Sequence, residues 1–167
     1  MPKLVSVSLA CIVLAPCLAP AAGMAAPRGE GQIRALEARF AAAVNAKNLD
    51  AIMQVYAKDV FVFDVSPPRQ YVGAAAYRAD WKGFTTGFTG PVKFAISDLV
   101  VSADGTIGYG HSIQHMSGTD PRGAKVDLTV RVTDVYRKTG RAWRIVHEHI
   151  SVPVNLDTAK ADLTSKP

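Results

Sequence analysis

The sequence predicts an α+β fold in which helices pack on one face of an antiparallel sheet. Helical periodicity is confined to the first half of the domain, and long runs of β-branched residues fill the second half. Short turn sequences, such as Asp104-Gly105 and Thr139-Gly140, separate those runs. We therefore expect three N-terminal helices followed by a meander of long strands.

The first 25 residues have the layout of a secretory signal peptide. Lys3 precedes an apolar stretch, which is followed by small residues. We expect cleavage after Ala25, with Ala22 as a second position, and a periplasmic or secreted mature protein. Both cysteines, Cys11 and Cys17, lie in this segment, so the mature chain would have no disulfide or thiol nucleophile. The alternative is a retained N-terminal anchor.

The charge pattern does not indicate a nucleic-acid-binding protein. The 167-residue chain has a formal charge of +5, and its basic residues stand singly or in pairs among acids. Such scattering is typical of a solvated surface rather than a basic stripe that follows phosphates. We expect one domain, no nucleic-acid partner and no membrane contact after signal cleavage.

Three helices are expected before the long strands. Over residues 30–46, apolar residues recur at intervals of three and four and form one face. Asn48 can cap a second helix over residues 49–57. A third helix begins near Gly73 and has aromatic residues at helical spacing.

The strands follow from β-branched runs and their breaks. A strand over 60–65 ends at Pro67-Pro68, and a short strand follows at 70–72. Four long strands are then expected at 92–103, 106–116, 125–138 and 142–154. Residues 155–167 read as a polar, irregular C-terminal tail.

Three segments carry a family resemblance over about residues 30–154. These are YAKDVFVFD, the following PPRQYVG, and WRIVHEHISVP near the end. Together with the element order, they resemble the SnoaL-like and ketosteroid isomerase-like branch of the NTF2-like superfamily. The resemblance implies a cystatin-like cone with an open pocket, a homodimer, and a small apolar ligand. It also implies either a cofactor-free isomerase, cyclase or dehydratase, or a non-catalytic ligand-binding or dimerisation module.

Two aspartates are the candidate catalytic residues. Asp64 alternates with Val60 and Val62, which places a carboxylate on an apolar strand face and predicts a raised pKa. The resemblance puts Asp64 at the position of the base and Asp134 at that of a protonated acid. Alternation independently makes Asp134 the single acid on an apolar row. The position of the oxyanion tyrosine is Phe40, which has no donor. A structural role for Asp64, hydrogen-bonded to a histidine, remains the alternative.

Six further side chains are candidate pocket residues. Each histidine pair shares one strand face, and Glu148 points away from its neighbours. Only two ligands are visible on one face, so we expect no metal site. No phosphate-binding glycine loop or serine triad is present in the sequence, and no cofactor is expected. The six residues are Tyr56, Trp81, His111, His115, His147 and His149.

Overall fold

The computed structural model describes residues 28–165, so the proposed signal segment lies outside the described residues. The first half contains α1 (Arg28–Asn45), α2 (Leu49–Met53), β1 (Tyr56–Phe63), β2 (Tyr71–Val72) and α3 (Ala74–Thr86). The second half contains β3 (Thr89–Asp104), β4 (Ile107–Thr119), β5 (Lys125–Thr139), β6 (Ala142–Ser151), β7 (Val154–Asn155) and β8 (Lys160–Ala161). No helix within residues 28–165 is long and apolar enough to span a membrane.

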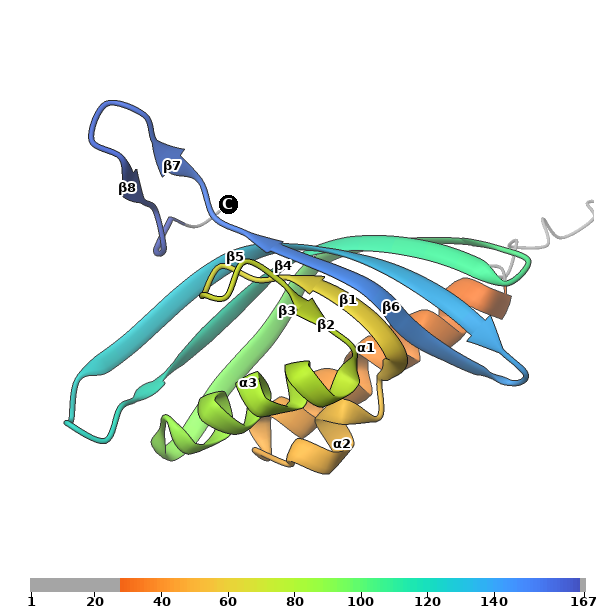
Figure 1. The fold of residues 1–167 in the computed structure, drawn as a ribbon, viewed down its shortest axis with the longest axis horizontal. Helices are drawn as coiled ribbons and strands as arrows, with labels where there is room; N and C mark the ends of the chain where they lie inside the picture. Colours follow the sequence, from red (N-terminus) through yellow and green to blue (C-terminus); the bar gives the residue numbers. More distant parts are fainter. Residues whose placement is uncertain (1–27, 166–167) are drawn as a thin grey trace, which may run out of the picture.

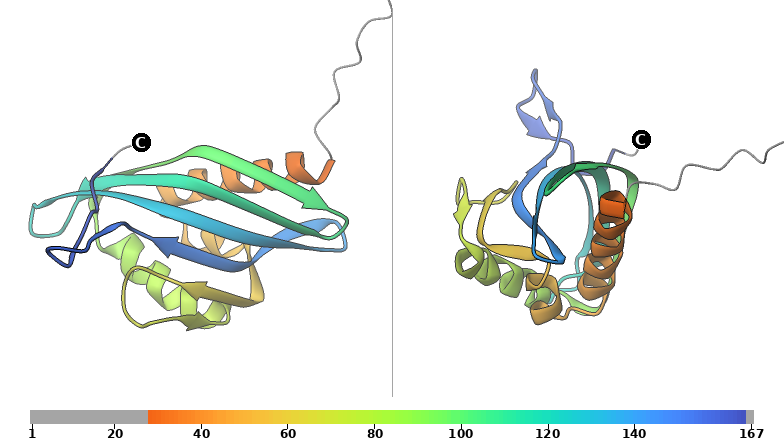
Figure 2. Two further views of the ribbon diagram at one scale, coloured as in Figure 1. Left: turned by 90° about the horizontal axis from the view of Figure 1, so that it is seen from above. Right: turned by 90° about the vertical axis from the view of Figure 1, so that its right-hand side faces the viewer.

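A single six-stranded sheet forms the body of the molecule. Its strand order is β2-β1-β6-β5-β4-β3, and all neighbours are antiparallel except β1 and β6, which run parallel. The sheet curves strongly, and the three helices close the open side of the curve (Figures 1 and 2). The predicted α+β class is confirmed.

The core lies between the concave face of the sheet and the helices. The periodic apolar residues of α1 are buried, including Ile33, Leu36, Phe40 and Val44. The Phe40 ring packs edge-on against Trp81, with 5.5 Å between centroids. This burial of the apolar stripe supplies the main driving force for docking α1 on the sheet.

The region around α2 differs from the expected boundaries. Asn48 caps the helix as predicted, because its Oδ1 accepts from Ala51 N at 3.0 Å. The helix ends at Met53, however, and β1 begins at Tyr56 rather than at residue 60. Pairing with β6 explains the early start, because Ile145 N donates to Val55 O at 2.9 Å.

The C-terminal segment forms a short hairpin instead of the expected irregular tail. Strands β7 and β8 pair with each other and project from the sheet (Figure 1). A backbone bond of 2.8 Å from Thr129 N to Leu163 O attaches this region to the sheet, and one of 2.8 Å from Asp162 N to Pro153 O joins the two arms of the hairpin at its base. The hairpin is therefore fastened to β5 at its base.

Candidate functional site

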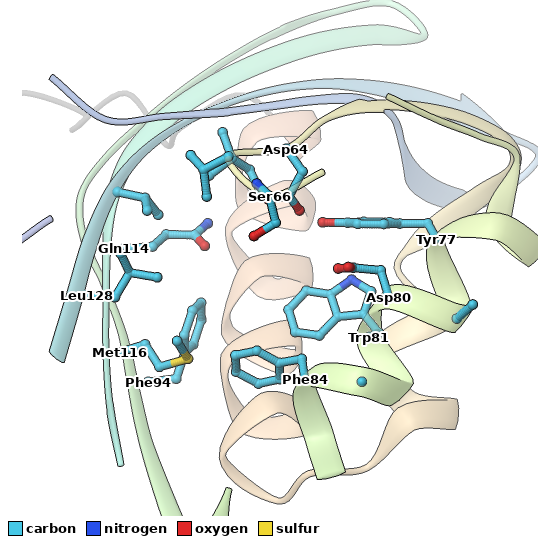
Figure 3. Close-up of a pocket in the computed structure, with 15 residues that line it drawn as sticks. Asp64, Ser66, Tyr77, Asp80, Trp81, Phe84, Phe94, Gln114, Met116 and Leu128 are labelled. Carbon is cyan, nitrogen blue, oxygen red and sulfur yellow. The ribbon is translucent and has the colours of Figure 1, made fainter. Parts of the chain in front are cut away.

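A pocket of about 450 Å³ opens between α3, the end of β1 and the concave face of the sheet. Figure 3 shows its side chains. Aromatic and aliphatic residues form most of the wall: Trp81, Phe84, Phe94, Met116, Leu128, Val130 and Ile150. The polar lining residues are Asp64, Ser66, Tyr77, Asp80 and Gln114. This composition suits a small, largely apolar ligand with one or two polar groups.

Asp64 lies in the pocket, directly after the last residue of β1. Its Oδ1 accepts a hydrogen bond from Ser66 N at 3.1 Å. Partial burial raises the pKa of the Asp64 carboxyl, and the nearby Asp80 charge adds to this effect. The amides of Ser66 and Val65 oppose the shift without reversing it. The raised pKa agrees with the direction predicted from alternation with the two valines of β1.

Tyr77 connects the pocket with the interior of the protein. Its ring belongs to the pocket wall, and its hydroxyl points toward Asp64 in Figure 3. The same hydroxyl donates to Glu148 Oε1 at 2.5 Å. The short distance is typical of a charge-assisted O–H···O bond to a carboxylate.

Behind Tyr77 lies a group of three buried carboxyls, Glu37, Asp134 and Glu148, called here the acid cluster. Each is at most 3% exposed. The Tyr136 hydroxyl donates to Glu37 Oε1 at 2.9 Å and lies 3.4 Å from Asp134 Oδ2. Burial raises the pKa of Glu37 and of Glu148 to about 7.

The pKa of Asp134 is raised well above its usual range, first by burial and then by the charges of Glu148 and Glu37. Within the described chain, no lysine or arginine forms an ion pair with any of the three acids. Carboxylates this close cannot all ionise without a cation. The acid cluster therefore holds protons at neutral pH.

Asp134 does not line the pocket, although it is buried on the predicted face of β5. It lies behind the wall, and its Oδ1 receives no proton from a donor in the described structure. The Glu148 carboxyl is its hydrogen-bonding neighbour across the strand pair. A direct contact between Asp134 and a pocket ligand is therefore not supported.

The prediction that His111 and His115 line the pocket is wrong. They share a face of β4 as expected, but it is the outer face, where Tyr109 is 55% exposed. The inner row contains Gly108, where an added Cβ would lie 2.7 Å from Ile33 Cδ1. Helix α1 approaches β4 at this glycine. The row of β4 that contains Gly108 therefore faces inward, although it has few apolar side chains.

The prediction that His147 and His149 line the pocket is also wrong. The β5–β6 register shifts between the pairs Tyr136↔Ile145 and Val135↔His147, so Val146 forms a β-bulge. The bulge turns both histidines outward, where the His147 ring packs against Phe61 and Phe63. Glu148, expected on the opposite side from them, consequently points into the protein.

The two aromatic candidates have different positions. Trp81 lines the pocket as predicted, and its Nε1 has no acceptor among the described residues. Tyr56 is 5% exposed and does not line the pocket. Its hydroxyl donates to Glu148 Oε2 at 3.1 Å, so it supports the acid cluster instead.

Several polar residues of the site are absent from the sequence-based candidates. Glu37 had a visible signal, because it falls on the apolar face of α1 between Ile33 and Phe40. Gln114 is 7% exposed, but it is one polar residue on a strand whose histidines were the stronger candidates. Ser66 and Asp80 lie outside the strands and had no periodic signal. Within residues 28–165, no group of three metal-ligating side chains could hold a metal ion.

Comparison with known proteins identifies the family. A model of the SnoaL-like domain matches residues 33–155. This chain belongs to the SnoaL-like family. An NTF2-like protein of unknown function from Pseudomonas putida KT2440 is 32% identical, with a TM-score of 0.75, over 83% of this chain and 96% of that one. No curated protein matches this SnoaL-like chain.

More distant structures share the fold of this SnoaL-like domain. An NTF2-like superfamily protein from Salmonella enterica is 15% identical, with a TM-score of 0.67, over 76% of this chain and 92% of that one. A proposed dehydratase of the NTF2-like family from Streptomyces avermitilis is 16% identical, with a TM-score of 0.64, over 72% and 93%. At these identities the similarity shows the fold alone.

Proposed function

We propose that this SnoaL-like protein is an exported, cofactor-free enzyme that removes a proton from a small apolar carbonyl compound, with Asp64 as the base. The observation that carries the proposal is the Asp64 carboxylate, with its raised pKa, in a largely apolar pocket. A base works best when its pKa approaches the working pH, and partial burial moves Asp64 in that direction.

The proposed step begins with the carbonyl compound bound so that its α-carbon faces Asp64. The carboxylate takes the α-proton, the C–H electron pair becomes part of the enolate, and negative charge develops on the carbonyl oxygen. Returning the proton to another carbon gives an isomerase. In a dehydratase the enolate electrons instead form the α,β double bond, and the β-hydroxyl group takes the proton from Asp64 and leaves as water. Dehydration is the activity proposed for the Streptomyces avermitilis protein.

The developing oxyanion needs a hydrogen-bond donor, and two of the family positions cannot supply one. Phe40 is a core aromatic residue, and Asp134 lies behind the pocket wall. The Tyr77 hydroxyl, the Ser66 hydroxyl and the Gln114 amide are the donors among the polar groups that line the pocket. A single well-placed donor of this kind contributes about 3–4 kcal/mol to transition-state stabilisation.

Proton abstraction is testable without the natural substrate. We expect the protein to accelerate hydrogen–deuterium exchange at the α-carbon of 2-tetralone in D₂O, followed by NMR. The Asp64→Asn variant should lose about 10²–10⁴-fold of this acceleration. Asp127→Asn, on the outer face, is the matched control and should retain it. Exchange no faster than in buffer, or undiminished in Asp64→Asn, would exclude the proposal for this ketone class.

A non-catalytic ligand-binding module is the second candidate. It is favoured by Phe40, which leaves the oxyanion position without a donor, and by the position of Asp134 outside the pocket. The decisive measurement is mass spectrometry of small molecules that co-purify with the protein. A bound compound recovered unchanged after long incubation would favour this candidate over the enzyme.

A further inference from the structure

We infer that Tyr77 and Glu148 together set how tightly the pocket binds a ligand whose polar group is only a hydrogen-bond acceptor. The Tyr77 hydroxyl lies between the pocket and the acid cluster and donates to Glu148 Oε1 at 2.5 Å. A hydroxyl has one proton, so in this orientation the tyrosine oxygen offers only lone pairs to the pocket. The inference deepens the proposed function by naming the polar group that the ligand must carry.

Protonation of Glu148 requires one of its hydrogen bonds to reverse. Tyr56 donates to Glu148 Oε2 at 3.1 Å. Asp134, whose pKa is raised well above its usual range, keeps its own proton and shares it with Glu148, because its Oδ1 has no other partner and its Oδ2 has only the Tyr136 hydroxyl at 3.4 Å. Tyr56 is buried with no other acceptor in the described structure, so turning its hydroxyl away would leave an unpaired donor. Tyr77 borders the pocket, so its hydroxyl can rotate and donate its proton to a group in the pocket. The reversal therefore falls on Tyr77.

The electrostatics place this reversal in the neutral range. Burial is the largest cause that raises the pKa of Glu148 to about 7, while its two tyrosine donors lower it. The titratable groups around the pair are acids and phenols: Glu37 from α1, Tyr56 and Asp64 from β1 and its end, Tyr71 from β2, Asp80 from α3, and Asp134 and Tyr136 from β5. With no cation among them, Glu148 gains its proton as the pH falls through about 7.

The two states of Glu148 give the pocket different hydrogen-bonding properties. With Glu148 neutral, its own hydroxyl donates to Tyr77, and the Tyr77 proton is free to bind a carbonyl oxygen. With Glu148 ionised, Tyr77 accepts from the pocket, and its hydroxyl offers a carbonyl group no donor. The Gln114 amide and the Ser66 hydroxyl do not discriminate, because both point into the pocket in Figure 3 and each can donate and accept in either state of Glu148.

Two fluorescent probes of similar size test the inference. The carbonyl oxygen of 2-acetylnaphthalene can only accept, whereas the hydroxyl of 2-naphthol can donate or accept. As the pH rises through neutrality, we expect the affinity for 2-acetylnaphthalene to fall by about five- to tenfold. The affinity for 2-naphthol should stay nearly constant, so the ratio of the two affinities is the readout.

Variants separate this pair from other titrating groups. Tyr77→Phe and Glu148→Gln should each abolish the pH dependence of the ratio. Tyr109→Phe, an exposed tyrosine on the outer face, is the matched control and should retain it. Repeating the titration in an Asp64→Asn background removes the second carboxyl that faces Tyr77 from the pocket. An unchanged ratio in the wild-type protein, or a pH-dependent ratio in Tyr77→Phe, would overturn the inference.

A measurement without ligand tests the pair independently of the proposed function. In protein labelled with ¹³C at the tyrosine Cζ, the Tyr77 signal should shift with a midpoint near neutral pH, and Glu148→Gln should remove the shift. A Tyr77 signal that stays constant across this range overturns the inference even if the probes bind. If neither probe binds, the ligand class and the proposed function both fail, while the tyrosine signal still decides on the hydrogen-bond reversal.

Discussion

At the scale of single residues, ionisation states determine what the pocket can do. Asp64 must be ionised to accept a proton, and Glu148 must be neutral for Tyr77 to donate. Both carboxyls have raised pKa values, Asp64 because of partial burial and Glu148 because of full burial. The working range of the proposed enzyme therefore lies above the pKa of Asp64 and below about 7, where Glu148 loses its proton.

Asp64→Asn is expected to leave the fold intact or slightly more stable. A folded pKa above the unfolded value means that folding favours the neutral form. This contribution to stability is complete at low pH and is lost as the pH rises through the folded pKa. Asparagine stays neutral and so should match the wild type in acid and equal or exceed it at neutral pH. Thermal melts followed by circular dichroism check this. Unfolding of the variant would mark Asp64 as a structural carboxylate.

Glu37→Gln should stabilise the protein above neutral pH. The pKa of Glu37 rises from 4.5 to about 7 on burial, so ionising it costs folding free energy as the pH increases between these values. Glutamine still accepts the bond from Tyr136. The gain should reach at most about 3 kcal/mol in alkaline solution and vanish in acid.

Urea unfolding at two pH values measures the effect of Glu37→Gln. Glu30→Gln, a substitution in the first turn of the same helix, is the control and should show no such pH-dependent gain. Equal stability of Glu37→Gln and wild type at high pH would contradict this prediction, because it would show that the burial of Glu37 carries no pH-dependent cost in folding free energy.

At the scale of secondary-structure elements, the bulge in β6 decides which side chains reach the pocket. Before Val146, Trp143 and Ile145 face inward, and after it Glu148 and Ile150 do. A strand without the extra residue would present His147 and His149 to the ligand instead. Because of this one inserted residue, a buried acid and an aliphatic side chain face inward in place of two histidines.

Substitutions at two adjacent residues of β6 should therefore differ in their effect on ligand binding. His149→Ala is expected to leave the affinity for 2-acetylnaphthalene unchanged, because the side chain lies on the outer face. Ile150→Ala removes apolar contact from the pocket wall and should weaken binding by about 1 kcal/mol, roughly fivefold. Fluorescence titration measures both. A stronger effect of the histidine variant would contradict the bulge.

At the scale of the whole molecule, the outer face of the sheet carries a row of apolar and histidine side chains. Cross-strand pairing aligns them in one row through β3, β4, β5, β6 and β1: Val100, His111, Thr133, His149 and Phe63. Val100 is 48% exposed and Phe63 37%. We propose that this row belongs to the interface of a homodimer, which the family resemblance also implies.

The homodimer is testable by light scattering at micromolar concentration. We expect the wild type to be dimeric and Val100→Glu to be monomeric, because a buried unpaired charge costs about 2 kcal/mol or more. Leu156→Glu, at the 92% exposed tip of the β7–β8 hairpin, is the control and should stay dimeric. A wild type that is only monomeric would rule the interface out.

Export can be checked at the same scale. N-terminal sequencing of the mature protein should begin near Ala26. Recovery of a soluble cytoplasmic form that retains Met1 would contradict the proposed signal peptide. This segment lies outside the described residues, so the proposal rests on the sequence pattern alone.

Periodicity in the sequence by itself determined the helices α1 and α3, the four long strands, and the inward position of Asp134. These features depend on local repeats of about 3.6 and 2 residues, which tertiary contacts reinforce. Asp64 was likewise identified from its alternation with Val60 and Val62. The SnoaL-like family was recognisable from the order of these elements and three short segments.

Only the tertiary structure decided which row of β4 faces inward and where the face of β6 changes. Alternation separates two rows of a strand but does not say which is buried. Glycine at position 108 and a bulge at Val146 settled that through close packing and register. The meeting of the three acids was likewise decided by the tertiary structure, because Glu37, Asp134 and Glu148 come from three elements far apart in the chain. Their shared protons arise from the mutual burial of carboxyls, which no local pattern records.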